Sequence, residues 1–217
     1  MLLNAVLFDF DGVLARTMED NERAWRFAVE PWIQDLGEEE YLLLEGLSPK
    51  GVAEALLGVR GLPLEGVPEI VIRKEQAYLR DHAFSLYPGI PELLDRLAVR
   101  LPLALVTGAA RVRLEATLDP RVLRQFKAIV TADDQVSPKP SPEPYLKAAA
   151  DLGVNPVNCL VVENAPLGIQ SARAAGMVVV AVASTLAPIH LVGADHLAQD
   201  SQAMAALLGF LTQGVAP

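Results

Sequence analysis

The chain has 217 residues, of which 52% are hydrophobic and 21% charged, and its formal net charge is −9. This length and composition suit one α/β domain, or a core with a small insertion, and exclude a disordered chain. The negative charge and the lack of a long basic run argue against nucleic acid and anionic membrane surfaces as partners. A small anionic substrate is still compatible, since a metal and one or two local cations can reverse the field in a pocket.

The single cysteine, Cys159, excludes an intrachain disulfide and favours a reducing compartment. The first seven residues lack the basic start and the cleavage site that are typical of a signal peptide. No uncharged apolar stretch reaches the length of a membrane-spanning helix. We therefore expect a cytoplasmic protein without membrane contact.

Short apolar runs predict the strands of a sheet: Ala5–Phe8, Leu103–Val106, Ala128–Val130, Cys159–Val162 and Val178–Val182. Continuous apolarity at this length is typical of parallel strands that are buried on both faces. Helix-like segments lie between and after them, at residues 91–99, 141–152, 167–175 and 203–211. The alternation predicts a doubly wound, Rossmann-like α/β core.

The segment from Arg16 to Phe84 breaks this alternation. It has no comparable strand-like run, and its helix-like stretches lie at residues 21–29, 39–44, 51–57 and 68–80. We therefore predict a core of residues 1–15 and 86–217, and a helical cap domain of residues 16–85. Tyr87-Pro88-Gly89 then marks the return to the core with a break that suits a hinge.

Four short motifs follow strand-like runs or lie in loops: Asp9-Phe10-Asp11-Gly12, Thr107-Gly108, Lys139-Pro140 and Glu163-Asn164. Each is weak alone, because Asp-Gly and Thr-Gly pairs are common in ordinary turns. As a set they are informative, since ligands of open α/β sheets bind beyond the carboxyl ends of the strands. The four motifs together predict one phosphoryl-transfer site.

With these motifs the chain resembles the haloacid dehalogenase superfamily of hydrolases, from Leu7 to about Ala181. It is most similar to the branch of phosphoglycolate phosphatases and beta-phosphoglucomutases, which have a parallel-sheet core and a helical cap inserted after the first strand. The resemblance implies that Asp9 is a nucleophile that forms an aspartyl-phosphate. It implies that Asp11 is a general acid and then a general base.

The resemblance also implies a Mg²⁺ ion, with Asp9, the backbone carbonyl of Asp11 and Asn164 as ligands and Glu163 nearby. Oxygen ligands suit this hard cation. Relatives usually carry Asp where this chain has Asn164, and an amide oxygen can ligate but brings no charge. We therefore expect weaker metal binding than in those relatives.

The phosphoryl oxygens are expected to meet the Thr107 hydroxyl, the Gly108 backbone N–H and the Lys139 ammonium. A loop that enters a helix can offer backbone N–H groups to an anion. Lys139 supplies a compact positive charge for the phosphoryl group and for Asp9.

The expected function is hydrolysis of a small phosphorylated metabolite, with three cap positions, Asn21, Gly46 and Lys50, facing the leaving group. A sugar-phosphate mutase is the alternative, but such mutases carry a histidine at the position of Asn21 and basic residues near Gly46. A non-catalytic binding protein of the same fold is a third hypothesis, supported only by Asn164. Dehalogenation is disfavoured because Asp11 would have no leaving oxygen to protonate.

Overall fold

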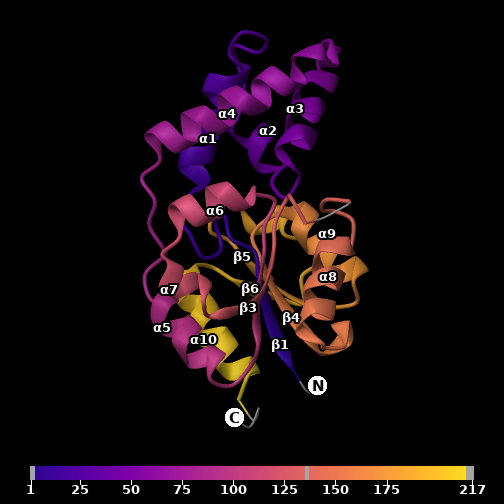
Figure 1. Cartoon of the computed structure of the whole chain (residues 1–217). Coiled ribbons are helices and arrows are strands. Elements are labelled where there is room, and N and C mark those ends of the chain that lie inside the picture. Colours follow the sequence, from indigo (N-terminus) through magenta and orange to yellow (C-terminus); the bar gives the residue numbers. More distant parts are fainter. Residues whose placement is uncertain (1–2, 135–136, 214–217) are drawn as a thin grey trace.

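The computed structural model describes residues 3–134 and 137–213 of the chain. Six parallel strands form one sheet in the order β3-β2-β1-β4-β5-β6 (Figure 1). They are β1 (Ala5–Phe8), β2 (Leu103–Val106), β3 (Phe126–Val130), β4 (Cys159–Glu163), β5 (Val178–Val182) and β6 (His196–Ala198). All five predicted strands are present. The prediction lacks β6, a strand of three residues at the edge of the sheet that has no continuous apolar run.

Alternate side chains of β1 belong to opposite faces of the sheet, and both faces are covered by helices. Val6 and Phe8 pack in one cluster with α5 (Ile90–Ala98) and α10 (Ser201–Leu211). Ala5 and Leu7 pack in the other with α8 (Glu143–Leu152) and α9 (Pro166–Ala174). This double burial explains the continuous apolar runs and confirms the doubly wound α/β core. Cys159 is part of the buried strand β4, as a small apolar residue would be.

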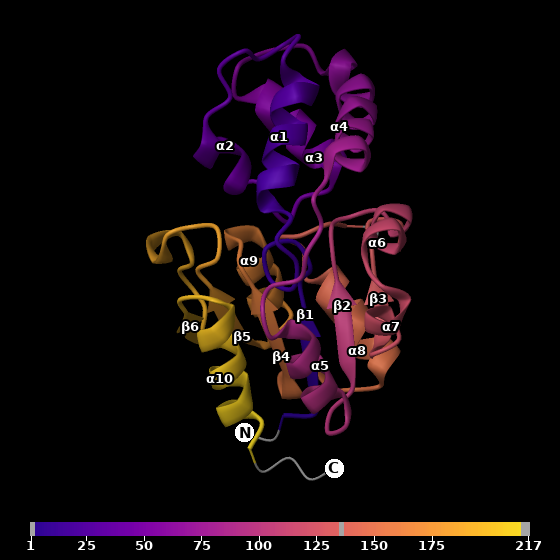
Figure 2. The same ribbon diagram turned by 90° about the vertical axis from the view of Figure 1, so that its left-hand side faces the viewer.

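Four helices between the first two strands form a separate layer beyond the carboxyl ends of the strands (Figures 1 and 2). They are α1 (Met18–Val29), α2 (Glu38–Leu42), α3 (Pro49–Gly58) and α4 (Val67–Asp81). The apolar faces of these helices bury Trp25, Leu56 and Ile70 among them. The predicted all-helical insertion is therefore present, with α1 packed along α4.

Short connecting elements complete the fold. They are α6 (Arg111–Thr117), α7 (Pro120–Leu123) and the 3₁₀ helices η1 (Leu64–Gly66), η2 (Pro156–Asn158) and η3 (Pro188–His190). Helices α6 and α7 were not predicted, because they are short and carry no extended apolar period. Among the helices within residues 3–134 and 137–213, none is long and apolar enough to cross a membrane.

Two chain segments join the helical layer to the sheet and run beside each other. The Arg16 N–H donates to the Ser85 carbonyl at 2.8 Å, and the Tyr87 N–H donates to the Leu14 carbonyl at 2.9 Å. The first segment starts at Gly12, whose φ of +79° is the left-handed conformation that favours glycine. The turn at Gly12 thus places Asp11 directly below the helical layer.

The strand order positions the site. Strand β1 lies in the middle, and the connections run outward through β2 and β3 on one side and through β4, β5 and β6 on the other. In such sheets the crevice at the carboxyl ends of the strands, where the order reverses, is the usual ligand site. Asp9 follows β1, Thr107 follows β2, and Glu163 ends β4, so all three reach this crevice.

Candidate active site

A buried lysine holds the strand ends together. The Nζ of Lys139 lies 2.6 Å from Oδ1 of Asp9 and 2.6 Å from Oε1 of Glu163. It also donates to the backbone carbonyl of Val106 at 3.3 Å. One ammonium group therefore contacts the ends of β1, β2 and β4, and its side chain is only 2% exposed.

Burial and charge shift the proton affinities of this group in opposite directions. Burial raises the pKa of Asp9 well above its usual range; Lys139 partly opposes this, and the nearby Glu163 and Asp11 charges add to it. Burial alone would lower the pKa of Lys139, but the carboxylates of Asp9 and Glu163 outweigh it and raise that pKa. Lys139 thus stays charged, and its ion pair with Asp9 favours the ionised form of that carboxyl against the effect of burial.

Glu163 has each of its oxygens satisfied by the protein. Its Oε1 accepts hydrogen bonds from Lys139 and from the Tyr145 hydroxyl, the latter at 2.7 Å. Its Oε2 accepts from the backbone N–H groups of Asn164 at 3.0 Å and Ala165 at 3.3 Å. Glu163 therefore anchors Lys139 and the loop after β4.

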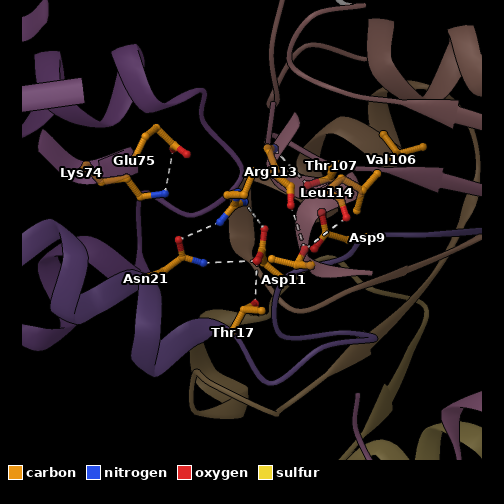
Figure 3. Close-up of polar contacts among 12 residues, drawn as sticks. Asp9, Asp11, Thr17, Asn21, Lys74, Glu75, Val106, Thr107, Arg113 and Leu114 are labelled. Atoms are coloured by element: carbon orange, nitrogen blue, oxygen red, sulfur yellow. Dashed lines mark hydrogen bonds and ion pairs between the residues drawn. The ribbon is translucent and has the colours of Figure 1, made fainter. Parts of the chain in front are cut away.

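Asp11 lies at the contact between the sheet and the helical layer (Figure 3). Its Oδ1 accepts from the Thr17 hydroxyl at 2.6 Å and from the Asn21 amide at 3.2 Å. Its Oδ2 accepts from an Arg113 guanidinium nitrogen at 2.7 Å. Burial would raise the pKa of Asp11, but the Arg113 charge and the Thr17 hydrogen bond outweigh it and lower that pKa.

Thr107 and Gly108 form the loop after β2. The Thr107 N–H donates to the Val130 carbonyl, and its hydroxyl accepts from the Ala109 N–H at 3.0 Å, so its own hydrogen can point to a ligand. A Cβ on Gly108 would lie 3.1 Å from the Leu47 carbonyl of the helical layer. This close approach of two backbones explains why a glycine fits here.

Asn164 lines the same cavity as Asp9 and Glu163 and carries a buried side-chain oxygen. Its Nδ2 donates to the Thr185 hydroxyl at 3.0 Å. Its Oδ1 is buried and has no hydrogen-bond partner within the residues that the structure describes. A buried carbonyl oxygen of this kind calls for a further ligand, and a hard cation would supply it.

The described part of the chain holds no ready cluster of three His, Cys, Asp or Glu side chains for a metal. Lys139 and Arg113 occupy the carboxylates instead. A cation would thus rely on the Asp9 carboxylate and on neutral oxygens, namely the Asp11 carbonyl and Asn164 Oδ1. This oxygen-only set fits Mg²⁺.

A cavity adjoins the carboxylates and is lined by residues of both the core and the helical layer. Sixteen residues line it: Asp9, Asp11, Asn21, Trp25, Tyr41, Glu45, Gly46, Leu47, Pro49, Val52, Lys74, Gly108, Arg113, Glu163, Asn164 and Ala165. The structure therefore brings the predicted residues Asn21 and Gly46 to the carboxylates. It does not bring Lys50 there: this side chain is 73% exposed on α3, and its ammonium lies 3.6 Å from Glu54. Lys50 was predicted to face the leaving group because it is the one cation near Gly46 in the sequence. In the structure, helix α3 directs its side chain to Glu54 and solvent.

Three charged residues of this cavity, Glu45, Lys74 and Arg113, were not among the predicted site residues. Arg113 is separated from Asp11 by 102 residues in the chain, and no motif links the two. Lys74 lies in a helix that carries both acidic and basic residues, and this sequence pattern predicts a surface position. Their signal is burial, which only the folded chain reveals.

The sequence and the fold are similar to those of known proteins. A model of the haloacid dehalogenase-like hydrolases matches residues 6–182. The chain belongs to this family. The match spans the four motifs and the helical insertion, as the resemblance predicted.

Named members of the haloacid dehalogenase-like family are similar over most of the chain. The fructose-1-phosphate phosphatase YqaB of Escherichia coli is 31% identical over 79% of this chain and 92% of its own. The beta-phosphoglucomutase of Bacillus subtilis is 30% identical over 83% of each chain. A solved hydrolase from Pseudomonas syringae is 25% identical, with a TM-score of 0.85 over 98% of this chain and 100% of its own.

The close packing around Glu163 gives a prediction for Gly168 in α9. An added Cβ there would lie 1.8 Å from Oε1 of Glu163, which is held by Lys139 and Tyr145. We expect Gly168→Ala to lower the free energy of unfolding by about 1–3 kcal/mol, as overpacking does. Gly209→Ala is the control, because a Cβ in this part of α10 meets nothing within 4 Å. Urea unfolding should show the control unchanged or slightly more stable, and equal stability of the two variants would contradict the packing argument.

Glu45 gives a prediction for pH. Burial and the Asp11 carboxylate raise the pKa of Glu45 from 4.5 to about 7. Between these pH values the folded chain holds this proton more tightly than the unfolded chain, so the Glu45 contribution to stability falls as the pH rises. Above about pH 7 the full penalty is present, and Glu45→Gln removes it.

We therefore expect Glu45→Gln to be more stable than the wild type at pH 8, by on the order of 1–3 kcal/mol. The difference should shrink as the pH falls through this range and vanish well below pH 4.5, since Glu45 is then neutral in both states. Urea unfolding across this pH range measures it, and Glu39→Gln at an exposed position of α2 is the control. A difference that did not change with pH would contradict the pKa of Glu45.

Proposed function

We propose that this chain is a Mg²⁺-dependent phosphatase that hydrolyses a small phosphorylated metabolite through an aspartyl-phosphate on Asp9. The observation that carries the proposal is the position of Asp9 at the end of β1. There Lys139 holds one of its oxygens, and Asp11 lies two residues further on beside the cavity. The buried, unpaired Cys159 fits a reducing, cytoplasmic setting.

The reaction would take two steps, and Asp11 would donate a proton in the first and accept one in the second. In the first, a carboxylate oxygen of Asp9 bonds to phosphorus, the ester P–O bond breaks, and Asp11 gives its proton to the leaving oxygen. In the second, the Asp11 carboxylate takes a proton from a water molecule. The water oxygen then bonds to phosphorus and the P–O bond to Asp9 breaks, which releases phosphate, restores the Asp9 carboxylate and leaves the proton on Asp11.

The contacts of Asp11 suit the second of these steps. The Arg113 ion pair and the Thr17 hydrogen bond favour its carboxylate form, which is the form that accepts a proton from water. For the first step Asp11 must carry a proton, and the ion pair between Arg113 and Asp11 must then be broken. Substrate entry therefore involves a change in the contacts of Arg113.

Three groups would stabilise the transferring phosphoryl oxygens: the Thr107 hydroxyl, the Gly108 N–H and the Lys139 ammonium. All three project from loops at the carboxyl ends of the strands. Donors that are fixed before the reaction stabilise developing charge without reorganisation. Lys139 is fixed by its two ion pairs, and Gly108 by its close contact with the helical layer.

Mg²⁺, when bound, supplies the positive charge that the buried carboxylates and the phosphoryl group need together. We propose as its ligands the carboxylate of Asp9, the carbonyl of Asp11 and Oδ1 of Asn164. Glu163 has both oxygens engaged by protein donors, so its proposed role is to fix Lys139 beside the metal. Asn164 replaces a charged ligand by a neutral one, which lowers metal affinity.

Residues 16–85 are proposed to act as a cap that closes over the site about the two paired connecting segments. Closure would exclude water and strengthen the interactions of Lys139 with the phosphoryl group. Asn21 and Gly46 would then face the leaving group. Asn21 stands where mutases of the related branch are expected to carry a histidine, so a device that selects attack by a sugar over attack by water is missing, and a phosphatase is favoured over a mutase.

Asp9→Asn tests the nucleophile. An amide cannot form the acyl-phosphate, so we expect the rate of phosphate release from an aryl phosphate to fall below a tenth of the wild-type rate, with the fold retained. Phosphate release and far-UV circular dichroism measure the two. Asp119→Asn, a change of the same kind at the exposed start of α7, is the control. A well-folded Asp9→Asn enzyme that kept a tenth or more of the wild-type rate would exclude Asp9 as nucleophile.

Asn164→Asp tests the metal site. The added carboxylate should tighten Mg²⁺ binding by about tenfold, or ~1.4 kcal/mol, as measured by calorimetric titration. Asn155→Asp is the control, because it adds the same charge just before β4, at the opposite end of that strand. Equal effects of the two changes would mean that only net charge matters. Undiminished turnover of the wild type in excess chelator would refute the proposed metal.

A further inference from the structure

Arg113 reaches from the core helix α6 into the cavity and is buried there, with 5% of its surface exposed. One terminal nitrogen donates to Asp11 at 2.7 Å and the other to Asn21 at 2.9 Å. Its Nε is buried and has no hydrogen-bond partner among the described residues. The Nε–H group of Arg113 can therefore donate a further hydrogen bond at the contact between core and cap (Figure 3).

A second buried cation approaches the same place from the cap. Lys74 of α4 is 3% exposed and lines the same cavity, and its ammonium forms an ion pair with the adjacent Glu75 at 3.1 Å. The Tyr78 ring centroid lies 4.8 Å from Cζ of Arg113 and 5.1 Å from Nζ of Lys74. Burial and the charge of Arg113 lower the pKa of Lys74 to about 8. Two buried cations that repel each other are a place where an anion would be stabilised.

These cations lie on the leaving-group side of the site. Lys139 and Glu163 hold Asp9 from the strand ends, whereas Arg113 contacts Asp11, the residue proposed to protonate the leaving oxygen. The atoms attached to that oxygen must extend past Asp11 toward the cap. They would meet Arg113 first and Lys74 next.

We propose that Arg113, assisted by Lys74, binds a second anionic group on the leaving part of the substrate. This rests on the proposed phosphatase function and names its substrate class: phosphate esters whose alcohol also carries a carboxylate or another phosphate. The planar guanidinium can give two parallel N–H bonds to either group. On binding, the substrate anion takes the place of Asp11 beside Arg113. Nε is available as an additional donor.

A structural role for Arg113 makes a different prediction. If the residue only ties Asp11 to Asn21 and so holds the cap on the core, its loss should weaken all substrates alike. The two roles are separated by the ratio of kcat/KM between an anionic substrate and its neutral counterpart. This ratio is insensitive to a general loss of stability or activity.

Two matched pairs of substrates measure that ratio. 3-Phosphoglycerate and glycerol 3-phosphate differ by a carboxylate, and fructose 1,6-bisphosphate and fructose 1-phosphate differ by a phosphate. We expect the wild type to prefer the anionic member of at least one pair by tenfold or more, and that pair identifies the anion. Arg113→Gln should lower the ratio by roughly 10- to 100-fold, the usual value of a charge-assisted hydrogen bond.

Further variants keep the test decisive. Arg113→Lys should retain part of the preference for the anionic substrate. Lys74→Met should lower this preference, and it changes a residue of the cap helix α4 and none of the core. Arg111→Gln is the matched control, because Arg111 lies on the same helix but pairs with Asp134 at 2.9 Å outside the cavity. An unchanged ratio in Arg113→Gln and Lys74→Met, or no wild-type preference in either pair, would overturn the proposal.

The failure of the proposed function would look different. In that case the wild type would release no phosphate from any ester, including an aryl phosphate. The same pairs can then be compared as ligands of the Asp9→Asn variant by calorimetric titration, with and without Arg113→Gln. Tighter binding of the anionic member that is lost with Arg113→Gln would support the anion site, and equal binding would refute it.

Discussion

The contact on which the rest of the structure depends is the sharing of one ammonium group by two buried carboxylates. Lys139 lies between Asp9 and Glu163, and each of these residues stands at the end of a central strand. Breaking such a buried pair leaves an uncompensated charge, which costs about 3–5 kcal/mol. The loop that carries Lys139 is thereby fixed to the carboxyl ends of the central strands. Tyr145 of α8 and the loop after β4 are held there through their hydrogen bonds to Glu163. The packing of the core and the placement of the chemistry thus depend on the same three side chains.

The sequence was informative where the physical signal is local. The five predicted strands are buried on both faces, so apolarity alone marks them, and the residues that follow them are positioned by the topology of the sheet. Strand β6 and helices α6 and α7 carry no such signal, because they are short and have no continuous apolar run. The motif residues could be grouped because each follows a strand or opens a loop. Gly12 is a similar case, since its turn forces a positive φ.

The contacts of the cap could not be predicted in this way. Arg113 and Lys74 are remote in sequence from the motifs, and arginine and lysine are usually surface residues. Only the fold therefore shows that both are buried in the same cavity. Lys50 is the converse: its place near Gly46 suggested the cavity, but its side chain points to Glu54 and solvent. Along a helix, a difference of one or two residues rotates a side chain to another face. A loop position predicted from sequence therefore does not determine where the neighbouring helix directs its side chains.

The distribution of charge around the cavity differs from the one that the family resemblance implies for a mutase of the related branch. Such mutases are expected to carry basic residues near the Gly46 loop, whereas this chain has Glu45 there, at a position that lines the cavity. The cations of this cavity enter from other elements, Arg113 from the core and Lys74 from the last cap helix. Because α6 belongs to the core and Asn21 to the cap, the Arg113 contacts also couple closure of the cap to the charge beside Asp11. An anion that replaced Asp11 at Arg113 would alter both at once. The choice of substrate and the state of the proposed acid would then depend on the same guanidinium group.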